Sequence, residues 1–331
     1  MIIQVHDKAS WNLFHQVQSQ VYKNDSKFIF PIKKEIETIL SQENAQCFVY
    51  LNSNGTPTGR IAAFFDKEKN KSLIHPLGGI GFFECVHDEK IAGELFKTAE
   101  NYLSEKGIQV IEGPVNFGER DRYWGLLTDG FFPPLYQENY HPEYYRKFFD
   151  HHGYKPFEQI ITFKGLSSAI PFDRMKAVAQ RIRERYPVEI KKLDYTHLDQ
   201  FASDFAEVYN ASFSKFAHFK PLVAEKVAEF MKQAKPIVDT ELACIAYFEN
   251  KPAGFIALYP DINPFLKGLK GDLSGWNVIQ FLLRKNLART FNAKGMGFGI
   301  HPEYQSKGIF ALLLDHLSTP RNVKKYPQMF L

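Results

Sequence analysis

The chain repeats its own order of strands, turns and helices, and this repeat limits the folds open to it. Residues 50–66 and 247–261 each contain an apolar run, a polar turn, the pattern Pro-x-Gly-x-Ile-Ala and an aromatic run. Turn residues between two apolar runs predict a β-hairpin. Residues 81–103 and 297–317 form a second pair, and each reads as a strand, a loop and a helix. Chance recurrence of hairpin patterns is the alternative, but two pairs in the same order favour two domains with one α/β plan.

The segments between the repeats alternate between strand and helix patterns. In the first half we expect strands at 2–5, 80–85, 108–115 and 157–164, and helices at 11–23, 90–106 and 142–152. In the second half we expect a strand at 188–193 and helices at 198–211 and 222–233. The sequence therefore predicts a domain at residues 1–165, a helical connector at 166–187 and a domain at 188–331.

An insert at residues 263–289 interrupts the second half and ends in a predicted helix at 276–287. An insert that precedes a binding strand is either a lid over a substrate cleft or a surface excursion.

Composition narrows the class of protein. A chain of 331 residues with 44% hydrophobic and 24% charged residues is typical of globular domains. The net charge of +4 is too small to indicate a nucleic-acid-binding face. The three cysteines Cys47, Cys85 and Cys244 are scattered, which predicts neither a disulfide framework nor a metal site. No signal peptide, lipidation motif or apolar run near 18 residues is evident, so we expect a cytoplasmic protein without a membrane partner. The oligomeric state is left open.

The segment at 297–317 carries the clearest chemical signal. An apolar strand ends at Ile300, Pro302 and a polar loop follow, and Gly308 opens an apolar helix. Such a helix start offers unpaired backbone N–H groups and the positive end of the helix dipole to a phosphate or pyrophosphate. Gln305, Ser306 and Lys307 add donors and one positive charge. The alternative is an ordinary buried connection between a strand and a helix.

These residues resemble motif A of the GNAT acetyltransferase superfamily, in which a strand is followed by Gln/Arg-x-x-Gly-x-Gly/Ala and a helix. The match covers Gln305 to Phe310, with Phe310 at the position where the family has glycine or alanine. The resemblance implies that the loop holds the pyrophosphate of acetyl-coenzyme A, or of another acyl-coenzyme A, and that the strand holds its pantetheine arm. The cofactor-binding residues it implies are Phe298, Gly299, Ile300, Gln305, Ser306, Lys307, Gly308, Ile309 and Phe310.

The same resemblance implies transfer of an acyl group to an amine of a small molecule or peptide. A backbone N–H near residues 298–300 would polarise the thioester carbonyl, and a base would take the proton of the amine. The candidate bases are Glu303 and His301. The simpler interpretation of Glu303 is a helix cap or an exposed side chain. The simpler interpretation of His301 is a histidine in a loop without a catalytic role.

The first half lacks the phosphate loop. At the aligned positions it has His87, Asp88, Glu89 and Lys90, and two carboxylates there would repel a pyrophosphate. We therefore expect this half to bind no coenzyme A and either to shape the substrate cleft or to stabilise a dimer-like packing of the two halves. Its loop at 116–134 contains Arg120, Asp121 and Arg122. One interpretation is that these charged residues contact a ligand, and the other is that they belong to a packed surface loop.

The expected fold is thus α/β, with two GNAT-like domains that each contain a mixed, splayed sheet flanked by helices. After Leu317 a domain of this kind needs a further strand, a helix and two strands, whereas 14 residues follow. We expect the closing arm of the second domain to be missing, with residues 326–331 beginning the next strand. The leading hypothesis is an acyl-coenzyme A N-acyltransferase. The alternatives are a non-catalytic acyl-coenzyme A sensor or scaffold, and a Fem-type aminoacyltransferase, which the modest charge disfavours.

Overall fold

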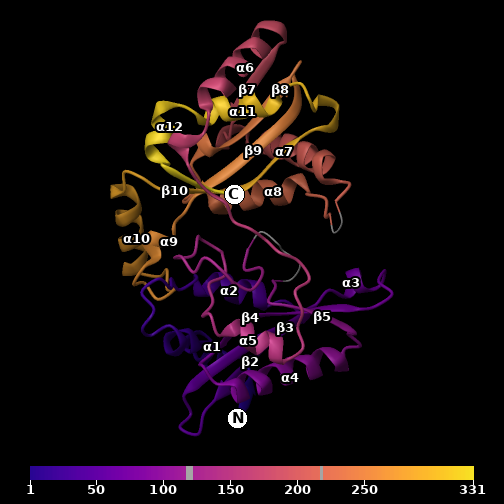
Figure 1. Cartoon of the computed structure of the whole chain (residues 1–331), viewed down its shortest axis with the longest axis vertical. Helices are drawn as coiled ribbons and strands as arrows, with labels where there is room; N and C mark the ends of the chain where they lie inside the picture. The colour runs from indigo at the N-terminus through magenta and orange to yellow at the C-terminus, as the bar shows by residue number, and fades with distance from the viewer. Residues whose placement is uncertain (117–121, 217–218) are drawn as a thin grey trace. The chain divides into compact units, whose positions relative to one another are not determined.

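The computed structural model describes residues 1–116, 122–216 and 219–331 of the chain (Figure 1). The backbone divides into two compact units. The first unit comprises residues 1–160 and 263–286, and the second comprises residues 161–262 and 287–331. Each unit has its own β-sheet.

The sheet of the first unit follows chain order. Its strands are β1 (Ile2–Gln4), β2 (Ala45–Leu51), β3 (Pro57–Phe65), β4 (Leu77–Cys85) and β5 (Val110–Glu112). The first four strands are antiparallel to their neighbours, and β5 runs parallel to β4. The pairing of β2 with β3 confirms the first predicted hairpin.

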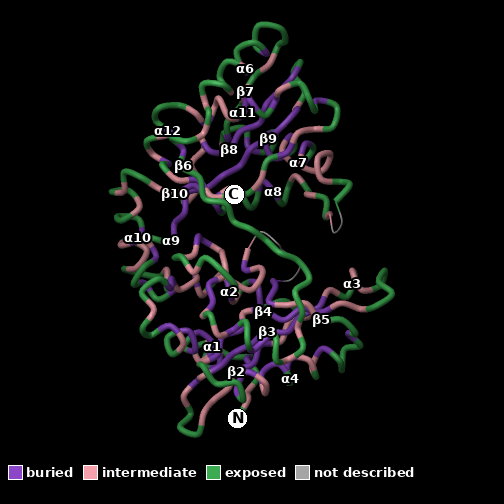
Figure 2. The backbone as a smooth tube through the Cα atoms, in the orientation of Figure 1, coloured by how far each residue is buried: buried purple, intermediate pink, exposed green. Residues whose placement is uncertain are grey.

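Helices cover both faces of this sheet (Figures 1 and 2). Helices α1 (Lys8–Val21) and α2 (Lys33–Leu40) pack on one face, and α4 (Glu89–Glu105) and α5 (Tyr145–His151) pack on the other. Side chains alternate along a strand, so Ile61 and Ala63 of β3 join the core below α4 whereas Ala62 joins the core below α1. The short helix α3 (Lys67–Asn70) lies between β3 and β4 in the chain.

The sheet of the second unit repeats this topology. In spatial order its strands are β7 (Val188–Lys192), β8 (Ala243–Phe248), β9 (Lys251–Pro260), β10 (Asn292–Ile300), β11 (Gln328–Phe330) and β6 (Lys164–Leu166). From β7 to β10 neighbours are antiparallel, and β11 runs parallel to β10. The directions therefore match those from β1 to β5, as the sequence repeats predict.

The layers also correspond. Helices α6 (Phe172–Arg185) and α11 (Ile309–Leu317) cover one face of the second sheet, and α7 (Leu198–Phe213) and α8 (Ala224–Ala234) cover the other. Helix α12 (Pro320–Lys325) precedes β11. Short 3₁₀ turns complete the unit at η1 (Ser167–Ala169), η2 (Tyr195–His197), η3 (Thr240–Leu242) and η4 (Pro302–Tyr304). Two mixed sheets flanked by helices confirm the predicted fold class.

Two segments differ from expectation. The strand predicted at 157–164 is wrong, because the chain pairs only at Lys164–Leu166, and its partner is β11 of the second sheet. The edge of β11 is free to accept it, and the backbones of Phe163 and Leu331 extend the pairing with bonds of 2.7 and 3.0 Å. Helix α6, which the sequence assigns to a connector, packs Ala179 and Ile182 into the second core. The strand expected to begin within 326–331 is confirmed as β11.

Residues 263–286 of the insert belong to the first unit, although the flanking strands belong to the second. The insert contains α9 (Asn263–Leu266) and α10 (Trp276–Leu287). The Asn263 side-chain amide donates to the Pro134 carbonyl at 2.8 Å, and the Lys33 amide donates to the Gly271 carbonyl at 2.9 Å. Gly271 has a φ of +72°, and a Cβ there would collide with the Pro31 carbonyl. Glycine therefore allows this close approach.

Candidate functional site

The second sheet opens along one edge of β10. Strand β11 pairs only with residues 292–294 of β10, and a bulge at Met296 interrupts the pairing of β10 with β9. Within the described chain, the backbone of residues 295–300 receives hydrogen bonds from β9 alone. A bulge beside an unpaired edge leaves peptide groups available to an extended ligand.

A pocket of about 780 Å³ lies at this edge. Ser212, Phe213 and Phe216, at and after the end of α7, form one wall. Strand β10 and the loop into α11 form the rest, and these contribute eight of the nine cofactor-binding residues implied by the sequence: Phe298, Gly299, Ile300, Gln305, Ser306, Gly308, Ile309 and Phe310. The fold thus gathers residues from two distant parts of the chain around one cavity whose volume suits a ligand of moderate size.

Four of the residues that line this cavity lie where the loop leads into α11. The turn η4 leads to Ser306 and Gly308, which have φ angles of +65° and +79°, and α11 begins at Ile309. The amides of Ser306, Gly308, Ile309 and Phe310 have no acceptor among the described residues. Gly308 is required by its conformation and by packing, because a Cβ there would collide with Ile182 of α6. Four donors at a helix start form a cradle for an anion.

Lys307 lies apart from the cavity. Its Nζ is 4.6 Å from the ring centre of Phe248 and 5.2 Å from that of Tyr304, and Lys307 does not line the pocket. The attraction of a cation to aromatic faces accounts for this position. The Lys307 ammonium, which the sequence assigns to the phosphate loop, therefore lies over the Phe248 ring and not in the pocket.

The cavity has an apolar wall. Phe298 and Phe310 contact each other with ring centres 5.0 Å apart, and both remain partly exposed, at 49% and 39%. Met296 and Phe216 continue the same surface. Phe310, the residue that departs from the motif, thus contributes to an apolar surface beside the amides.

The two candidate bases lie outside the pocket lining. His301 donates its amide to the Ala253 carbonyl at 2.9 Å, and its Nδ1 accepts the Glu303 amide at 3.3 Å. The histidine therefore caps η4, and Glu303 is exposed. Among the described lining residues there is no carboxylate or imidazole.

Ser212 is a polar group that no sequence signal identifies. Its Oγ is buried and has no hydrogen-bond partner within the described residues. A Cβ at Gly299 would lie 2.9 Å from this oxygen, so the hydroxyl faces the backbone of β10. Buried hydroxyls are nearly always hydrogen-bonded, and an unpaired one that lines a cavity is available to a ligand.

The matching edge of the first sheet is occupied. The Cys85 amide donates to the Tyr145 hydroxyl at 2.7 Å, and the Tyr144 hydroxyl donates to the Cys85 carbonyl at 2.9 Å. Asp88 caps α4 by accepting the amides of Lys90 and Ile91 at 3.0 and 3.2 Å. A carboxylate thus already fills the helix start that would face a pyrophosphate.

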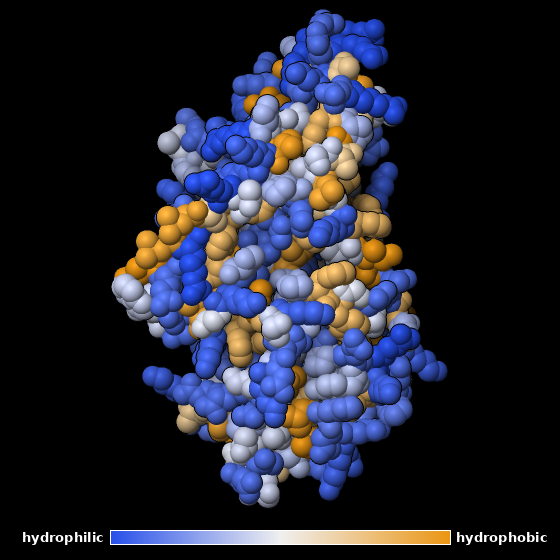
Figure 3. All heavy atoms as spheres, turned by 60° about the vertical axis from the view of Figure 1, so that its left-hand side comes forward, coloured by the Kyte–Doolittle hydropathy of each residue, from blue (hydrophilic) through white to orange (hydrophobic). Residues whose placement is uncertain are grey.

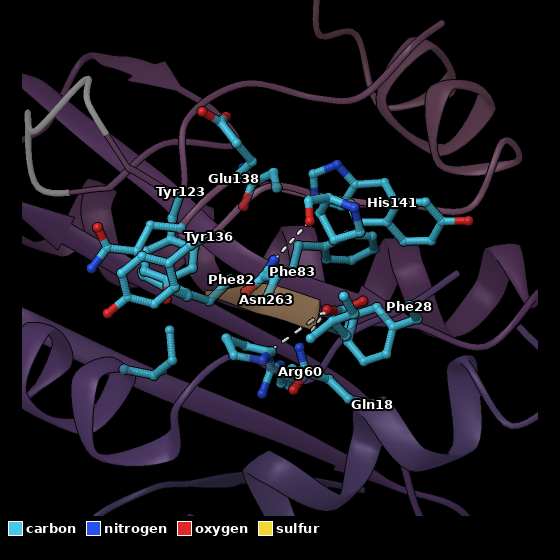
Figure 4. Close-up of a pocket in the computed structure, with 18 residues that line it drawn as sticks. Gln18, Phe28, Arg60, Phe82, Phe83, Tyr123, Tyr136, Glu138, His141 and Asn263 are labelled. Carbon is cyan, nitrogen blue, oxygen red and sulfur yellow. Dashed lines mark hydrogen bonds and ion pairs between the residues drawn. The ribbon is translucent and has the colours of Figure 1, made fainter. Parts of the chain in front are cut away.

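A buried ion pair lies at the matching position of the first sheet, and Figure 4 shows Arg60 beside the small cavity found there. Arg60 pairs with Glu84 across β3 and β4, where the second sheet has Phe255 and Gly299. The Arg60 guanidinium lies 3.6 Å from the Glu84 carboxylate, which also accepts Gln18, Tyr22 and Tyr145 at 2.9, 2.7 and 2.9 Å. Burial raises the pKa of Glu84, and Arg60 opposes that shift. The cavity left beside this pair is only about 40 Å³, enough for a few waters.

Other sequence expectations concern metals, membranes and the charged loop. In the described ranges, no cluster of three His, Cys, Asp or Glu side chains is placed to hold a metal ion. No helix in those ranges has the length and apolarity needed to cross a membrane. Arg120 and Asp121 lie outside the described residues.

Comparison with known protein sequences finds distant bacterial relatives. No family model matches the chain. Bacterial ceramide synthase from Caulobacter vibrioides (strain NA1000 / CB15N) is 23% identical over 316 residues, which are 92% of this chain and 81% of that protein. Protein YghO from Escherichia coli K12 is 25% identical over 322 residues, with 93% and 81% covered.

Among solved structures, a GCN5-related glucosamine N-acetyltransferase region of a fungal multi-domain GH3 β-N-acetylglucosaminidase matches 100% of this chain. The TM-score is 0.57, the identity is 11%, and this chain spans 35% of that one. An aminoglycoside N-acetyltransferase in complex with coenzyme A matches 49% of this chain and 96% of its own, with 13% identity and a TM-score of 0.31, too low to add to the argument. The chain thus has a mixed α/β fold that resembles the GNAT acetyltransferases.

Proposed function

We propose that the chain is an acyltransferase that moves an acyl group from coenzyme A to an amine, with the thioester bound at the pocket of the second unit. The observation that carries the proposal is the cradle of unpaired amides at Ser306, Gly308, Ile309 and Phe310, in line with the open edge of β10. The amides suit a pyrophosphate, and the unpaired backbone of residues 295–300 suits the amide groups of a pantetheine arm.

The reactive end of the thioester would then lie beside the bulge. We assign to Ser212 a hydrogen bond to the thioester carbonyl, because its buried hydroxyl faces Gly299 and has no partner among the described residues. A donor aimed at an oxygen that gains charge during the reaction lowers the barrier. Attack by a neutral amine expels the coenzyme A thiolate and leaves an amide, and the released proton passes to water or to the thiolate.

The apolar wall indicates the class of acyl group and acceptor. Phe216, Met296, Phe298 and Phe310 offer surface that an acetyl group is too short to cover, and burying methylene groups against such a wall favours a fatty acyl chain or a long-chain amine. The name of the Caulobacter relative agrees, since a ceramide is a fatty acid amide of a long-chain amino alcohol. We therefore favour a lipid amide as product.

A non-catalytic acyl-coenzyme A sensor is the second candidate. It is favoured by the described pocket lining, which contains no carboxylate or imidazole to act as a base. A sensor would bind acyl-coenzyme A and release no thiol.

The test is turnover with matched substrates. Purified protein is incubated with acetyl- or palmitoyl-coenzyme A and with either glucosamine or a long-chain amino alcohol, and thiol release and amide mass are measured. We expect thiol release and amide formation with palmitoyl-coenzyme A and the long-chain amine. Saturable binding with no thiol release for any pair would support the sensor instead, and absence of binding would refute both.

A further inference from the structure

Helix α10 exposes a stripe of large apolar side chains. Trp276, Ile279, Leu282, Leu283 and Leu287 are 66%, 46%, 39%, 53% and 79% exposed, and we call these five residues the α10 stripe. Spacings of three and four residues place them on one face of the helix. A contiguous apolar face of this kind marks an interaction surface rather than ordinary scattered exposure.

The opposite face holds the helix in place. Phe281 is buried, and the Arg284 guanidinium donates to the Phe265 and Lys267 carbonyls at 3.3 and 2.7 Å. The close approach of Gly271 to Pro31 and the bond from Lys33 anchor the insert to the rest of the first unit. The other face of α10 is thus fixed to the first unit, and the α10 stripe remains exposed to solvent.

The insert at residues 263–289 is strongly basic. Residues 263–289 contain five basic residues and one acidic residue, a net charge of +4, which equals the formal net charge of all 331 residues. The basic residues are Lys267, Lys270, Arg284, Lys285 and Arg289, and the acidic residue is Asp272. Lys267, Lys270 and Arg289 are exposed and form no ion pair within the described residues.

We propose that the α10 stripe docks on the surface of an anionic lipid bilayer. A helix with tryptophan and leucine on one face and lysine and arginine beside it suits the interface, where the apolar face enters the headgroup boundary and the cations meet lipid phosphates. Figure 3, which brings this side forward, shows exposed hydrophobic residues among strongly hydrophilic ones. A second copy is the poorer occupant, because its own charge of +4 would face this one.

This inference does not rest on the proposed function. It revises the expectation that the protein has no membrane partner, which rested on the lack of a spanning segment, since a helix that lies on a bilayer needs no such segment. Surface docking would also bring the protein to a membrane where lipid substrates reside.

The test is flotation of the full chain with vesicles, without substrate. We expect binding to vesicles of 70% phosphatidylcholine and 30% phosphatidylglycerol, weaker binding to pure phosphatidylcholine, and release by salt. The double variant Ile279→Glu/Leu283→Glu should weaken binding about tenfold or more, and Lys267→Glu/Lys270→Glu should weaken it about tenfold.

Matched controls lie on α8 and at Val223, the residue just before it. Val223→Glu/Phe230→Glu changes two residues of similar exposure, 48% and 49%, and Lys226→Glu/Lys232→Glu makes the same change of charge. Both should bind like wild type, and circular dichroism checks that every variant folds. The proposal is overturned if wild type does not float, if the controls lose binding equally, or if sedimentation shows a dimer that Ile279→Glu/Leu283→Glu dissociates. Because no acyl transfer is measured, failure here would leave the proposed function standing.

Discussion

At the scale of single residues, the proposed site depends on groups that lack partners. Ser306 and Gly308 hold left-handed backbone conformations and line the pocket, and the buried Ser212 hydroxyl has no hydrogen-bond partner among the described residues. Each unpaired group costs stability unless a ligand or water satisfies it. Their concentration around one cavity is the strongest local sign of a binding function.

Ser306 allows a charge-specific test of the cradle. Ser306→Asp places a carboxylate beside the proposed pyrophosphate, and we expect coenzyme A to bind about ten- to a hundredfold more weakly, measured by calorimetry. Ser306→Asn is the matched control, because asparagine has nearly the same shape, tolerates a positive φ and adds no charge. Equal affinities for the two variants would show that no phosphate lies there.

Ser212 is tested by kinetics. Ser212→Ala should lower kcat about ten- to a hundredfold with little change in KM, because the hydroxyl is assigned to the charge that develops on the thioester oxygen. Ser214→Ala, on an exposed serine just after α7, should behave as wild type. An unchanged kcat for Ser212→Ala would reduce Ser212 to a packing residue.

His141 predicts how stability depends on pH. Burial lowers its pKa to about 3, and its Nδ1 accepts the Leu127 amide at 3.1 Å, so it is neutral in the folded protein. Since the unfolded state binds the proton near pH 6.5, this contribution to stability is present above pH 6.5 and is lost as the pH falls from 6.5 towards 3. His141→Asn, which keeps an acceptor, should reduce the loss of unfolding free energy between pH 7 and pH 5 by about 2 kcal/mol in urea titrations. An unchanged pH dependence would mean that His141 ionises in the folded state.

At the scale of elements, the repeats were the most informative part of the sequence. Hairpin patterns around Gly59 and Gly254 are local, so both hairpins and the strand–loop–helix units could be predicted. The pairing of residues 157–164 could not be predicted, because their apolar pattern fits a strand in either sheet. Only the free edge of β11 determines that Lys164–Leu166 forms the strand. The attachment of the insert was also beyond prediction, since the bond from Lys33 to Gly271 joins residues far apart in the chain.

At the scale of the whole molecule, two units of one topology have different interiors at the same point of the sheet. The first has the Arg60–Glu84 pair and an Asp88 cap, and the second has glycine, a pocket and free amides. Buried charges need a partner, so Arg60 and Glu84 stay paired. The cavity beside them, about 40 Å³, is too small for coenzyme A. One unit is thus expected to bind the cofactor.

Stoichiometry tests that division. Calorimetry on the full chain should show one bound coenzyme A per chain. Ser306→Asp should weaken this binding, and no second binding site should appear. Two equivalent events, or a tight site that survives Ser306→Asp, would assign binding to the first unit as well. Asp88→Asn serves as the control, because it alters the α4 cap while leaving the cradle intact.

Local patterns were sufficient for most of the helices and strands, for the repeated hairpin and strand–loop–helix units, and for the loop that leads into a helix at Gly308, because turns, helix starts and amphipathic periods depend on neighbours in the chain. They were insufficient for Ser212 above Gly299, for Lys307 resting on Phe248, for the ion pair of the first unit and for the outward stripe of α10. These features arise when residues distant in the chain are packed against each other, and burial then determines which polar groups find a partner and which apolar ones stay exposed.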